Sequence, residues 1–241
     1  MNRVLVCGDT HGVDDIGKIK ELQNSENKLD YSDYIIICGD ACILWKEETV
    51  KSNIAIYESF GTNILSVDGN HENYDLLNTY SIEKWNGGLV HKISNHIIHL
   101  MRGQIFDICG KIIFTMGGAD SRYKENRVEH KGWWRQERID LSESPASNYI
   151  ENLAKYNNSV DYVITHTLPT SVIADYKDYI LSANIELTPF YLDKIIIKPS
   201  NEALEKVLKI IEFKHWYSGH RHTDVTFGKF SILYNNIIEL K

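Results

Sequence analysis

Five short motifs contain aspartate, asparagine or histidine, which are residue types that bind metal ions and transfer protons, and four of the five also contain glycine. They read Gly8-Asp9-Thr10-His11-Gly12, Gly39-Asp40, Gly69-Asn70-His71-Glu72, Thr165-His166-Thr167 and Gly219-His220-Arg221-His222. Side chains two positions apart in an extended segment point to the same side. Asp9 and His11 can therefore reach one cavity, and so can His220 and His222.

Seven side chains in these motifs offer carboxylate, amide or imidazole ligands. They are Asp9, His11, Asp40, Asn70, His166, His220 and His222. A set of oxygen and nitrogen ligands without thiolate suits manganese, our first expectation, or iron, nickel, zinc or magnesium. Seven ligands are too many for one ion but fit two ions roughly 3.5–4 Å apart that share a carboxylate. The predicted chemistry is hydrolysis assisted by two metals.

In this order the motifs resemble the signature of the calcineurin-like metallophosphoesterase family, particularly its bacterial and phage members. That signature runs D-x-H, G-D, G-N-H-[DE], H and G-H-x-H; a single element is weakly specific, but all five in order are highly specific. The resemblance implies one metal held by Asp9, His11, Asp40 and His222, and a second held by Asp40, Asn70, His166 and His220. It also implies a four-layer αββα sandwich of two mixed sheets flanked by helices.

His71 has a different expected role from its neighbour Asn70. Adjacent side chains diverge, and in the family the matching histidine faces the substrate phosphate. The resemblance thus implies that His71 protonates the leaving oxygen or stabilises charge on the phosphoryl group, while a metal-bridging hydroxide attacks in line.

A further segment, Gly117–Arg127 followed by Trp133–Glu137, resembles a stretch of bacterial and phage members that reads roughly G-G-A-x-S-x-D-K-x-x-R with paired tryptophans beyond. Tyr123 departs from this pattern, which usually has aspartate there. Arg127 and Arg122 are candidate phosphate-binding residues because a guanidinium offers a planar fork of donors. For Arg127 a solvated role is an equal alternative. Trp134 could stack on a nucleobase, although packing of the tryptophans is favoured.

The remaining histidines and the cysteines do not lie in metal-binding motifs. We expect surface or packing roles for His91, His96, His99, His130 and His215. We expect reduced, mostly buried thiols at Cys7, Cys38, Cys42 and Cys109, since their spacing matches no metal knuckle.

Strand-like and helical patterns alternate along much of the chain, which predicts an α/β sandwich. Buried strands are expected at Val4–Cys7, Tyr34–Cys38, Asn63–Val67, Lys111–Met116, Tyr162–Thr165 and Trp216–Ser218. Helices are expected around Asp14–Gln23, Glu47–Phe60, Ala146–Tyr156 and Asn201–Phe213. Between Leu89 and Met116 a strand-turn-strand pattern predicts an antiparallel addition to a mostly parallel sheet.

Length and composition bound the domain organisation and the partners. The chain has 241 residues, 43% hydrophobic and 24% charged, with a formal net charge of −7. We expect one domain over residues 1–241, with substrate-shaping insertions near 119–144 and 168–199.

The net negative charge predicts no general electrostatic attraction of the protein surface to nucleic acid or anionic membranes. Without an apolar run of membrane length or a signal peptide, a cytoplasmic location is expected. The expected partner is a phosphate-ester substrate, and the oligomeric state is left open.

The shared family core does not select a substrate. Gly39-Asp40 is followed by Ala41 and lacks the D-R-G continuation of the phosphoprotein phosphatases, and His166 lacks their paired glycines. A phosphodiesterase or a broad phosphomonoesterase is therefore favoured over a phosphoserine/threonine protein phosphatase. A non-catalytic scaffold of the same fold is a further alternative, but His71 and all seven ligands are present.

Overall fold

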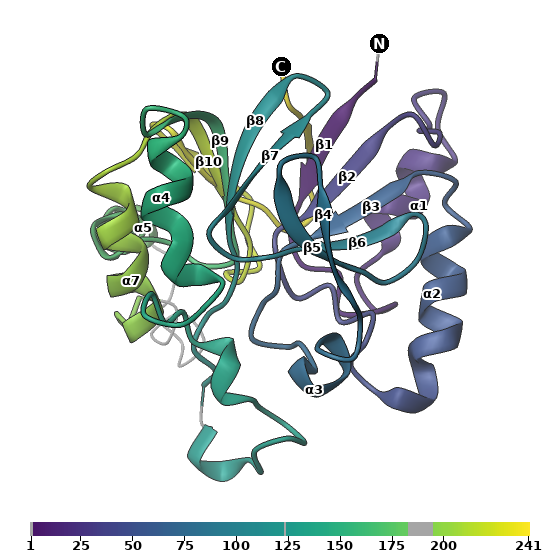
Figure 1. Cartoon of the computed structure of the whole chain (residues 1–241), viewed down its shortest axis with the longest axis horizontal. Coiled ribbons are helices and arrows are strands. Elements are labelled where there is room, and N and C mark those ends of the chain that lie inside the picture. Colours follow the sequence, from purple (N-terminus) through teal and green to yellow (C-terminus); the bar gives the residue numbers. More distant parts are fainter. Residues whose placement is uncertain (1, 123, 183–194) are drawn as a thin grey trace.

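The computed structural model describes residues 2–122, 124–182 and 195–241 and shows two mixed β-sheets packed face to face, with helices on their outer faces (Figure 1). The first sheet has the strand order β13-β1-β2-β3-β6-β5-β4, and the second has the order β11-β12-β10-β9-β8-β7. The predicted four-layer αββα sandwich is confirmed.

In the first sheet, parallel strands β1, β2, β3 and β6 form the centre, and antiparallel strands lie at both edges. Its strands are β1 (Val4–Cys7), β2 (Tyr34–Ile37), β3 (Asn63–Ser66), β4 (Ile82–Trp85), β5 (Gly88–Lys92), β6 (Ile97–Leu100) and β13 (Ile237–Glu239). The last strand thus pairs with the first, with Val6 opposite Ile238.

In the second sheet, β8, β9, β10 and β12 are parallel, and β7 and β11 are antiparallel edge strands. Its strands are β7 (Gln104–Ile108), β8 (Lys111–Met116), β9 (Ser159–Thr165), β10 (Glu212–Ser218), β11 (Val225–Phe227) and β12 (Phe230–Ile232). The strand-turn-strand region between Leu89 and Met116 is antiparallel as expected, but it divides between the sheets: β5 and β6 join the first, and β7 and β8 the second.

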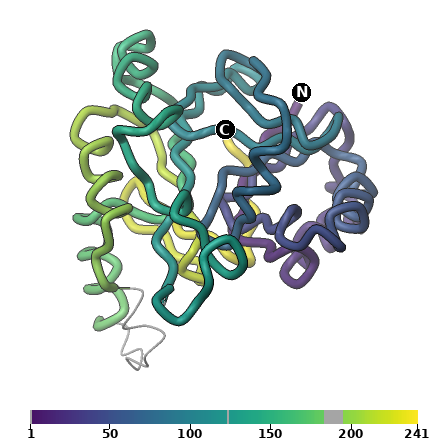
Figure 2. The backbone as a smooth tube through the Cα atoms, turned by 60° about the horizontal axis from the view of Figure 1, so that its bottom comes forward, coloured from purple at the N-terminus to yellow at the C-terminus, as the bar shows by residue number. Residues whose placement is uncertain are grey.

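Two groups of helices cover the outer faces, one on each side of the molecule in Figures 1 and 2. The helices are α1 (Gly17–Gln23), α2 (Val50–Glu58), α3 (Tyr74–Leu77), α4 (Tyr149–Ala154), α5 (Thr170–Ser182) and α7 (Pro199–Leu208), and short 3₁₀ turns lie at Glu47–Thr49, Lys124–Asn126, Arg135–Glu137 and Ala146–Asn148. Helices α1 and α2 lie beside the first sheet, and α4, α5 and α7 beside the second.

One helix prediction was wrong in part. The helix expected to end at Phe213 ends at Leu208, and β10 begins at Glu212 because Phe213 and Trp216 pack into the core beside β9. The stretch 168–199, expected to be a substrate-shaping insertion, contains α5 near its start. Its buried Val172, Ile173, Tyr176 and Ile180 have helical spacing that the sequence already displays. Residues 183–194 of this expected insertion lie outside the described residues.

Hydrophobic clusters lie on both faces of the first sheet, and alternate residues along a strand face different clusters. Val4 and Val6 of β1 face the cluster between the sheets, whereas Leu5 and Cys7 face the cluster under α1 and α2. This is the period-two pattern of a strand buried on both faces. Full burial of one such aliphatic side chain stabilises the fold by roughly 1.5–3 kcal/mol.

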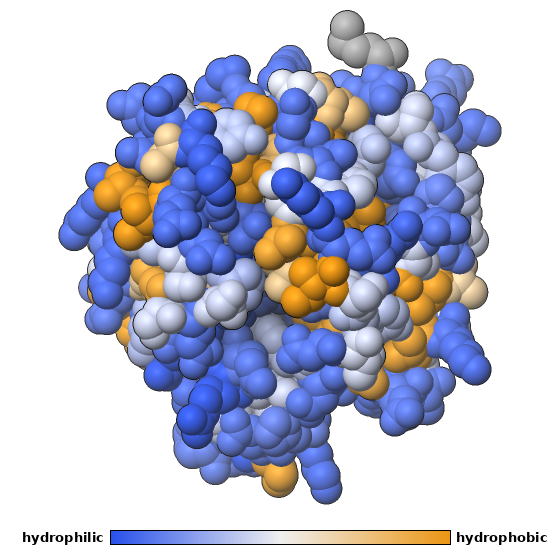
Figure 3. All heavy atoms as spheres, viewed as in Figure 1, coloured by the Kyte–Doolittle hydropathy of each residue, from blue (hydrophilic) through white to orange (hydrophobic). Residues whose placement is uncertain are grey.

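The other expected insertion, near 119–144, contains two of the 3₁₀ turns and projects below the sheets in Figure 1. On the face shown in Figure 3, hydrophobic residues form separate patches among hydrophilic ones. Among the described residues, no helix is long and apolar enough to cross a membrane.

Candidate metal centre

All five motifs follow strands whose carboxyl ends lie at the same edge of the sandwich. Asp9, Asp40 and Asn70 come after β1, β2 and β3 of the first sheet, and His166 and His220 come after β9 and β10 of the second. Ligand sites form at the carboxyl ends of parallel strands in such sheets. The topology therefore brings residues far apart in the sequence to one place.

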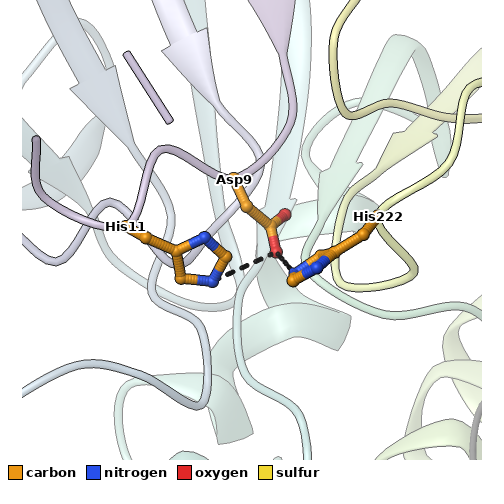
Figure 4. Close-up of side chains that lie close together, drawn as sticks. All are labelled: Asp9, His11 and His222. Atoms are coloured by element: carbon orange, nitrogen blue, oxygen red, sulfur yellow. Dashed lines mark hydrogen bonds and ion pairs between the residues drawn. The ribbon is translucent and has the colours of Figure 1, made fainter. Parts of the chain in front are cut away.

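One group consists of Asp9, His11 and His222, whose ligand atoms lie within 4.8 Å of one another (Figure 4). Asp9 Oδ2 lies 3.1 Å from His222 Nε2 and 3.9 Å from His11 Nε2. The other oxygen, Oδ1, accepts the backbone N–H of His220 at 2.8 Å. Asp9 is fully buried, and the two imidazoles are partly exposed, which leaves a path from solvent to the group.

A second group consists of Asp40, His166 and His220, again with ligand atoms within 4.8 Å of one another. His166 Nε2 lies 3.3 Å from Asp40 Oδ1 and 3.2 Å from Asn70 Oδ1, so the amide oxygen of Asn70 faces the same space. Each group contains three residues of one of the two ligand sets that the family resemblance implied, and their role as ligands stays a prediction.

Asp40 lies between the groups. Its Oδ1 faces His166 and accepts the backbone N–H of His71 at 2.7 Å, whereas its Oδ2 lies 3.5 Å from His11 Nε2. One carboxylate therefore presents an oxygen atom to each group, as a ligand shared by two ions must.

Hydrogen bonds on the outer nitrogens orient two of the imidazoles. His11 Nδ1 lies 2.7 Å from Asp15 Oδ2, and His166 Nδ1 lies 2.7 Å from the carbonyl oxygen of Cys38. An Nδ1–H donor to such an acceptor leaves Nε2 free to bind a metal, and this arrangement is usual for metal-binding histidines. Asp15 was not among the predicted site residues, although it lies four residues after His11.

The glycines of the motifs let the ligands approach the backbone closely. A Cβ atom on Gly39 would lie 2.3 Å from His166 Nδ1, and a Cβ atom on Gly69 would lie 2.0 Å from Asp40 Oδ1. The backbone is also strained, because His11, Asp40, His220 and His222 have positive φ angles. Such strain in non-glycine residues concentrates at functional sites.

Comparison with known proteins agrees with this geometry. The family model of the calcineurin-like phosphoesterases matches residues 2–224 of this chain. The chain belongs to this family. It is therefore a metal-dependent phosphoesterase, and the prediction of the enzyme class is confirmed.

A solved structure with a similar fold is that of phosphopantetheinyl hydrolase from Mycobacterium tuberculosis. It is 12% identical in sequence, with a TM-score of 0.42, and the match covers 96% of this chain and 87% of that one. No curated protein matches the chain.

The ligand set fits a pair of cations, as expected for a calcineurin-like phosphoesterase. Burial opposes ionisation of Asp40, but the neighbouring His166 and His11 rings hold the pKa of its carboxyl well below the usual range. In return, the Asp40 and Asp9 carboxylates outweigh burial and raise the pKa values of His11 and His166 to about 9. Without metal, protons on these imidazoles balance the buried carboxylates, and a bound cation must displace them.

His71 packs against a ring of the first group, that of His11, and against Trp45. Its ring centroid is 5.8 Å from that of His11 and 5.7 Å from that of Trp45. Burial lowers the pKa of His71; Asp40 raises it, and the positive charges of His11 and Arg127 lower it further. The imidazole of His71 therefore lies among charged groups of both signs, beside the first candidate metal-binding group.

The candidate substrate-binding residues of the insertion differ in their exposure to solvent. Arg127 is exposed and close enough to lower the pKa of His71, while its guanidinium donates to the carbonyl of Gly132 at 3.3 Å. Arg122 is half-buried. Trp134 is only 1% exposed, its ring packs on Trp45, and its Nε1–H donates to Asp75, so it packs as favoured and offers no face to a nucleobase.

The other histidines lie away from the metal-binding groups. His91 and His99 are opposite each other on β5 and β6, stack in the core, and have Nδ1 atoms 3.0 Å apart. His130 is exposed and pairs with Asp75, and Asn63 and Ser231 bond to His96 and His215, respectively. All four cysteines are free thiols, of which Cys109 is exposed and the others are buried.

Proposed function

We propose that this phosphoesterase binds two divalent metal ions side by side, manganese first among them, and hydrolyses small phosphodiesters or phosphomonoesters. The observation that supports it is the position of Asp40, with one oxygen toward His11 and the other toward His166 and Asn70. In this assignment Asp9, His11, Asp40 and His222 hold one ion, and Asp40, Asn70, His166 and His220 hold the other. Oxygen and imidazole ligands suit manganese, iron or zinc.

Bound ions would supply positive charge for the phosphoryl oxygens and acidify a water molecule for attack. The protein residues supply the rest. His71 donates a hydrogen bond to the phosphoryl group or to the leaving oxygen, and its backbone N–H fixes Asp40. Arg127, exposed beside His71, binds a non-bridging phosphate oxygen, and Arg122 assists it.

The residues after Asp40 support a small substrate. Ala41 and Cys42 occupy the turn where the phosphoprotein phosphatases continue with an arginine, and their backbone N–H groups donate to Glu72 Oε1 at 2.9 and 3.3 Å. This turn offers the substrate no charged side chain. Recognition beyond the phosphate is therefore left to the insertions near 119–144 and 168–199.

Metal content tests the two-ion assignment. After reconstitution with manganese, the wild-type protein should contain two ions per chain by elemental analysis. Asp40→Asn should lose both ions, since its carboxylate neutralises both cations, whereas His222→Ala should weaken one. A wild-type content of one ion or less after reconstitution with manganese, iron or zinc, or an Asp40→Asn variant that retains both ions, would refute the assignment.

Rates on matched substrates test the substrate class. The metal-loaded protein should hydrolyse an aryl phosphodiester or an aryl phosphomonoester faster than a phosphoserine peptide at equal concentration. Faster release of phosphate from the peptide would instead identify a protein phosphatase. Arg127→Ala should raise KM for the aryl substrates, and Arg135→Ala, at an exposed arginine of the same insertion, serves as the control.

A further inference from the structure

A buried glutamate in the insertion contacts the metal centre through one serine. Glu137 is 1% exposed. Its Oε1 accepts the backbone N–H of Ser121 at 2.7 Å, and its Oε2 accepts the hydroxyl of the same serine at 2.7 Å. Burial raises the pKa of the Glu137 carboxyl, but both hydrogen bonds from Ser121 lower it and favour the carboxylate. With Ser121 as the donor to both oxygens, the hydroxyl proton of Ser121 points toward Glu137.

The direction of this proton determines what Ser121 can do on its other side. With its hydrogen given to Glu137, the Ser121 Oγ presents lone pairs to Asn70, whose Nδ2 lies 3.4 Å away. The amide group of Asn70 therefore turns its N–H toward Ser121. Its Oδ1 consequently faces His166 Nε2 at 3.2 Å, on the side of the second metal-binding group.

The backbone around Glu137 is tied to the same segment as Asn70. Arg102 donates to the carbonyl oxygens of Gln136 and Glu137 and also pairs with Asp68, two residues before Asn70. The N–H of Gly118 donates to the carbonyl of Asp68 at 2.8 Å. The insertion is thereby fixed to the loop after β3, so the distance from Glu137 to Asn70 is set by the fold.

From this chain of contacts we propose that Glu137 and Ser121 are positioning residues for the metal centre, which fix the amide of Asn70 with its oxygen toward the second ion. The inference rests on the proposed function, in which Asn70 is a metal ligand. It gives the Gly117–Glu137 segment a role that is independent of substrate: the second ligand set is completed only when the insertion is docked. Partners that orient a ligand in this way typically change metal affinity by 10–100-fold.

Glu137→Gln is a nearly isosteric test. The glutamine oxygen must accept the Ser121 N–H, so its NH₂ group faces the Ser121 hydroxyl and donates to it. The serine proton is then free to point at Asn70, which favours the flipped amide with nitrogen toward the metal. Manganese titration followed by elemental analysis should show one tight ion, and a second that binds roughly 10–100-fold more weakly than in the wild type.

Two controls separate positioning from folding. Asp120→Asn changes another buried carboxylate of the insertion, which bonds to Arg138 and to the backbone N–H of Ser200, away from the metal-binding groups. It should retain both ions. Ser121→Ala should weaken binding of the second ion as Glu137→Gln does, and Ser121→Thr, which keeps a hydroxyl, should bind it with the affinity of the wild type.

The outcomes distinguish the two proposals. If the wild-type protein binds two ions and Glu137→Gln and Ser121→Ala bind both with unchanged affinity, the positioning role is refuted. If Glu137→Gln does not fold, the comparison of Ser121→Ala with Ser121→Thr decides in the same way. A wild-type protein that binds only one ion would refute the proposed function itself, before any variant is compared.

Discussion

Asn70 and His71 are neighbours, but their side chains contact different groups. Substitutions of the two residues should therefore have different effects on metal content and turnover. His71→Ala should retain two ions and lose turnover on the order of 10²–10⁴-fold if His71 donates a proton to the leaving group. The loss should be larger for an alkyl ester than for an aryl ester, because a phenolate leaves without help. The measurements are the metal content and kcat on both esters.

Other kinetic results for His71→Ala would indicate a different role for His71 in catalysis. Equal losses on both esters would mean that it stabilises the phosphoryl oxygens, which is what a neutral imidazole donor does. Turnover near that of the wild type on both esters, with metals bound, would remove His71 from the mechanism.

At the scale of single residues, the sequence indicated the ligands but not the residues that orient them. Asp9, His11 and His222 lie in short motifs whose types and spacing are visible without a structure. Glu137 and Ser121 contact Asn70 only because the insertion folds back across the loop after β3. No local spacing encodes such a contact, so the pattern could not reveal it.

The loops that follow the strands depend on glycine for space. Gly39→Ala would place a Cβ atom 2.3 Å from His166 Nδ1 at a residue with φ of +85°, so His166 must move. We expect lower thermal stability and weakened metal binding. Gly110→Ala is the matched control, because Gly110 has φ of +76° and open space around it.

For the control we expect a loss of stability of about 1 kcal/mol and unchanged metal content, since only backbone strain is introduced. Thermal unfolding and elemental analysis of both variants test this. Equal metal content in the two variants would show that crowding at His166 has no effect on the site.

The start of β2 is linked to the start of β1 by an ion pair with a pH-dependent effect. Asp33 is buried, yet hydrogen bonds from Arg3 and Asp30 lower the pKa of its carboxyl. A lowered pKa in the folded state adds stability above the carboxyl's unfolded pKa of about 3.9, and this stability is lost as pH falls through the folded value.

Asp33→Asn should therefore cost roughly 1–3 kcal/mol at pH 7, where Arg3 loses its charged partner. The difference from the wild type should shrink below pH 4. Urea unfolding at several pH values measures it, with Glu26→Gln, at an exposed carboxylate of the same connection, as the control. A difference that stays constant down to pH 3 would contradict this explanation.

Among the elements, the buried strands were predictable and the helix ends were less so. Val4–Cys7 and Lys111–Met116 were predicted to the residue, because a strand buried on both faces reads as a short apolar run. Phe213 was assigned to a helix because its apolar spacing continues that of α7. Pairing with β9 overrides that local signal.

Across the whole molecule, each candidate metal-binding group combines residues of both sheets. In the first group Asp9 and His11 follow β1 and His222 follows β10; in the second, Asp40 follows β2, and His166 and His220 follow β9 and β10. The assignment of strands to two sheets came from the family resemblance, because alternating strands and helices alone do not specify how many sheets they form.

Metal should consequently stabilise the fold by linkage. A ligand present at 100 times its Kd that binds only the folded state adds about 2.7 kcal/mol. We expect a chelator to lower the unfolding midpoint of the wild type and to leave that of Asp40→Asn nearly unchanged. Identical midpoints for the wild type with and without chelator would mean that the ions do not join the sheets.

The chain order of the ligands has a consequence for biosynthesis. Asp9, His11, Asp40 and Asn70 leave the ribosome early, but each group also needs a histidine from the end of the second sheet, His220 or His222. A nascent chain can therefore display four of its seven candidate ligands long before it can complete either site. Metal acquisition at either site is therefore expected only after residue 220 or 222 has been translated and the two sheets have come together.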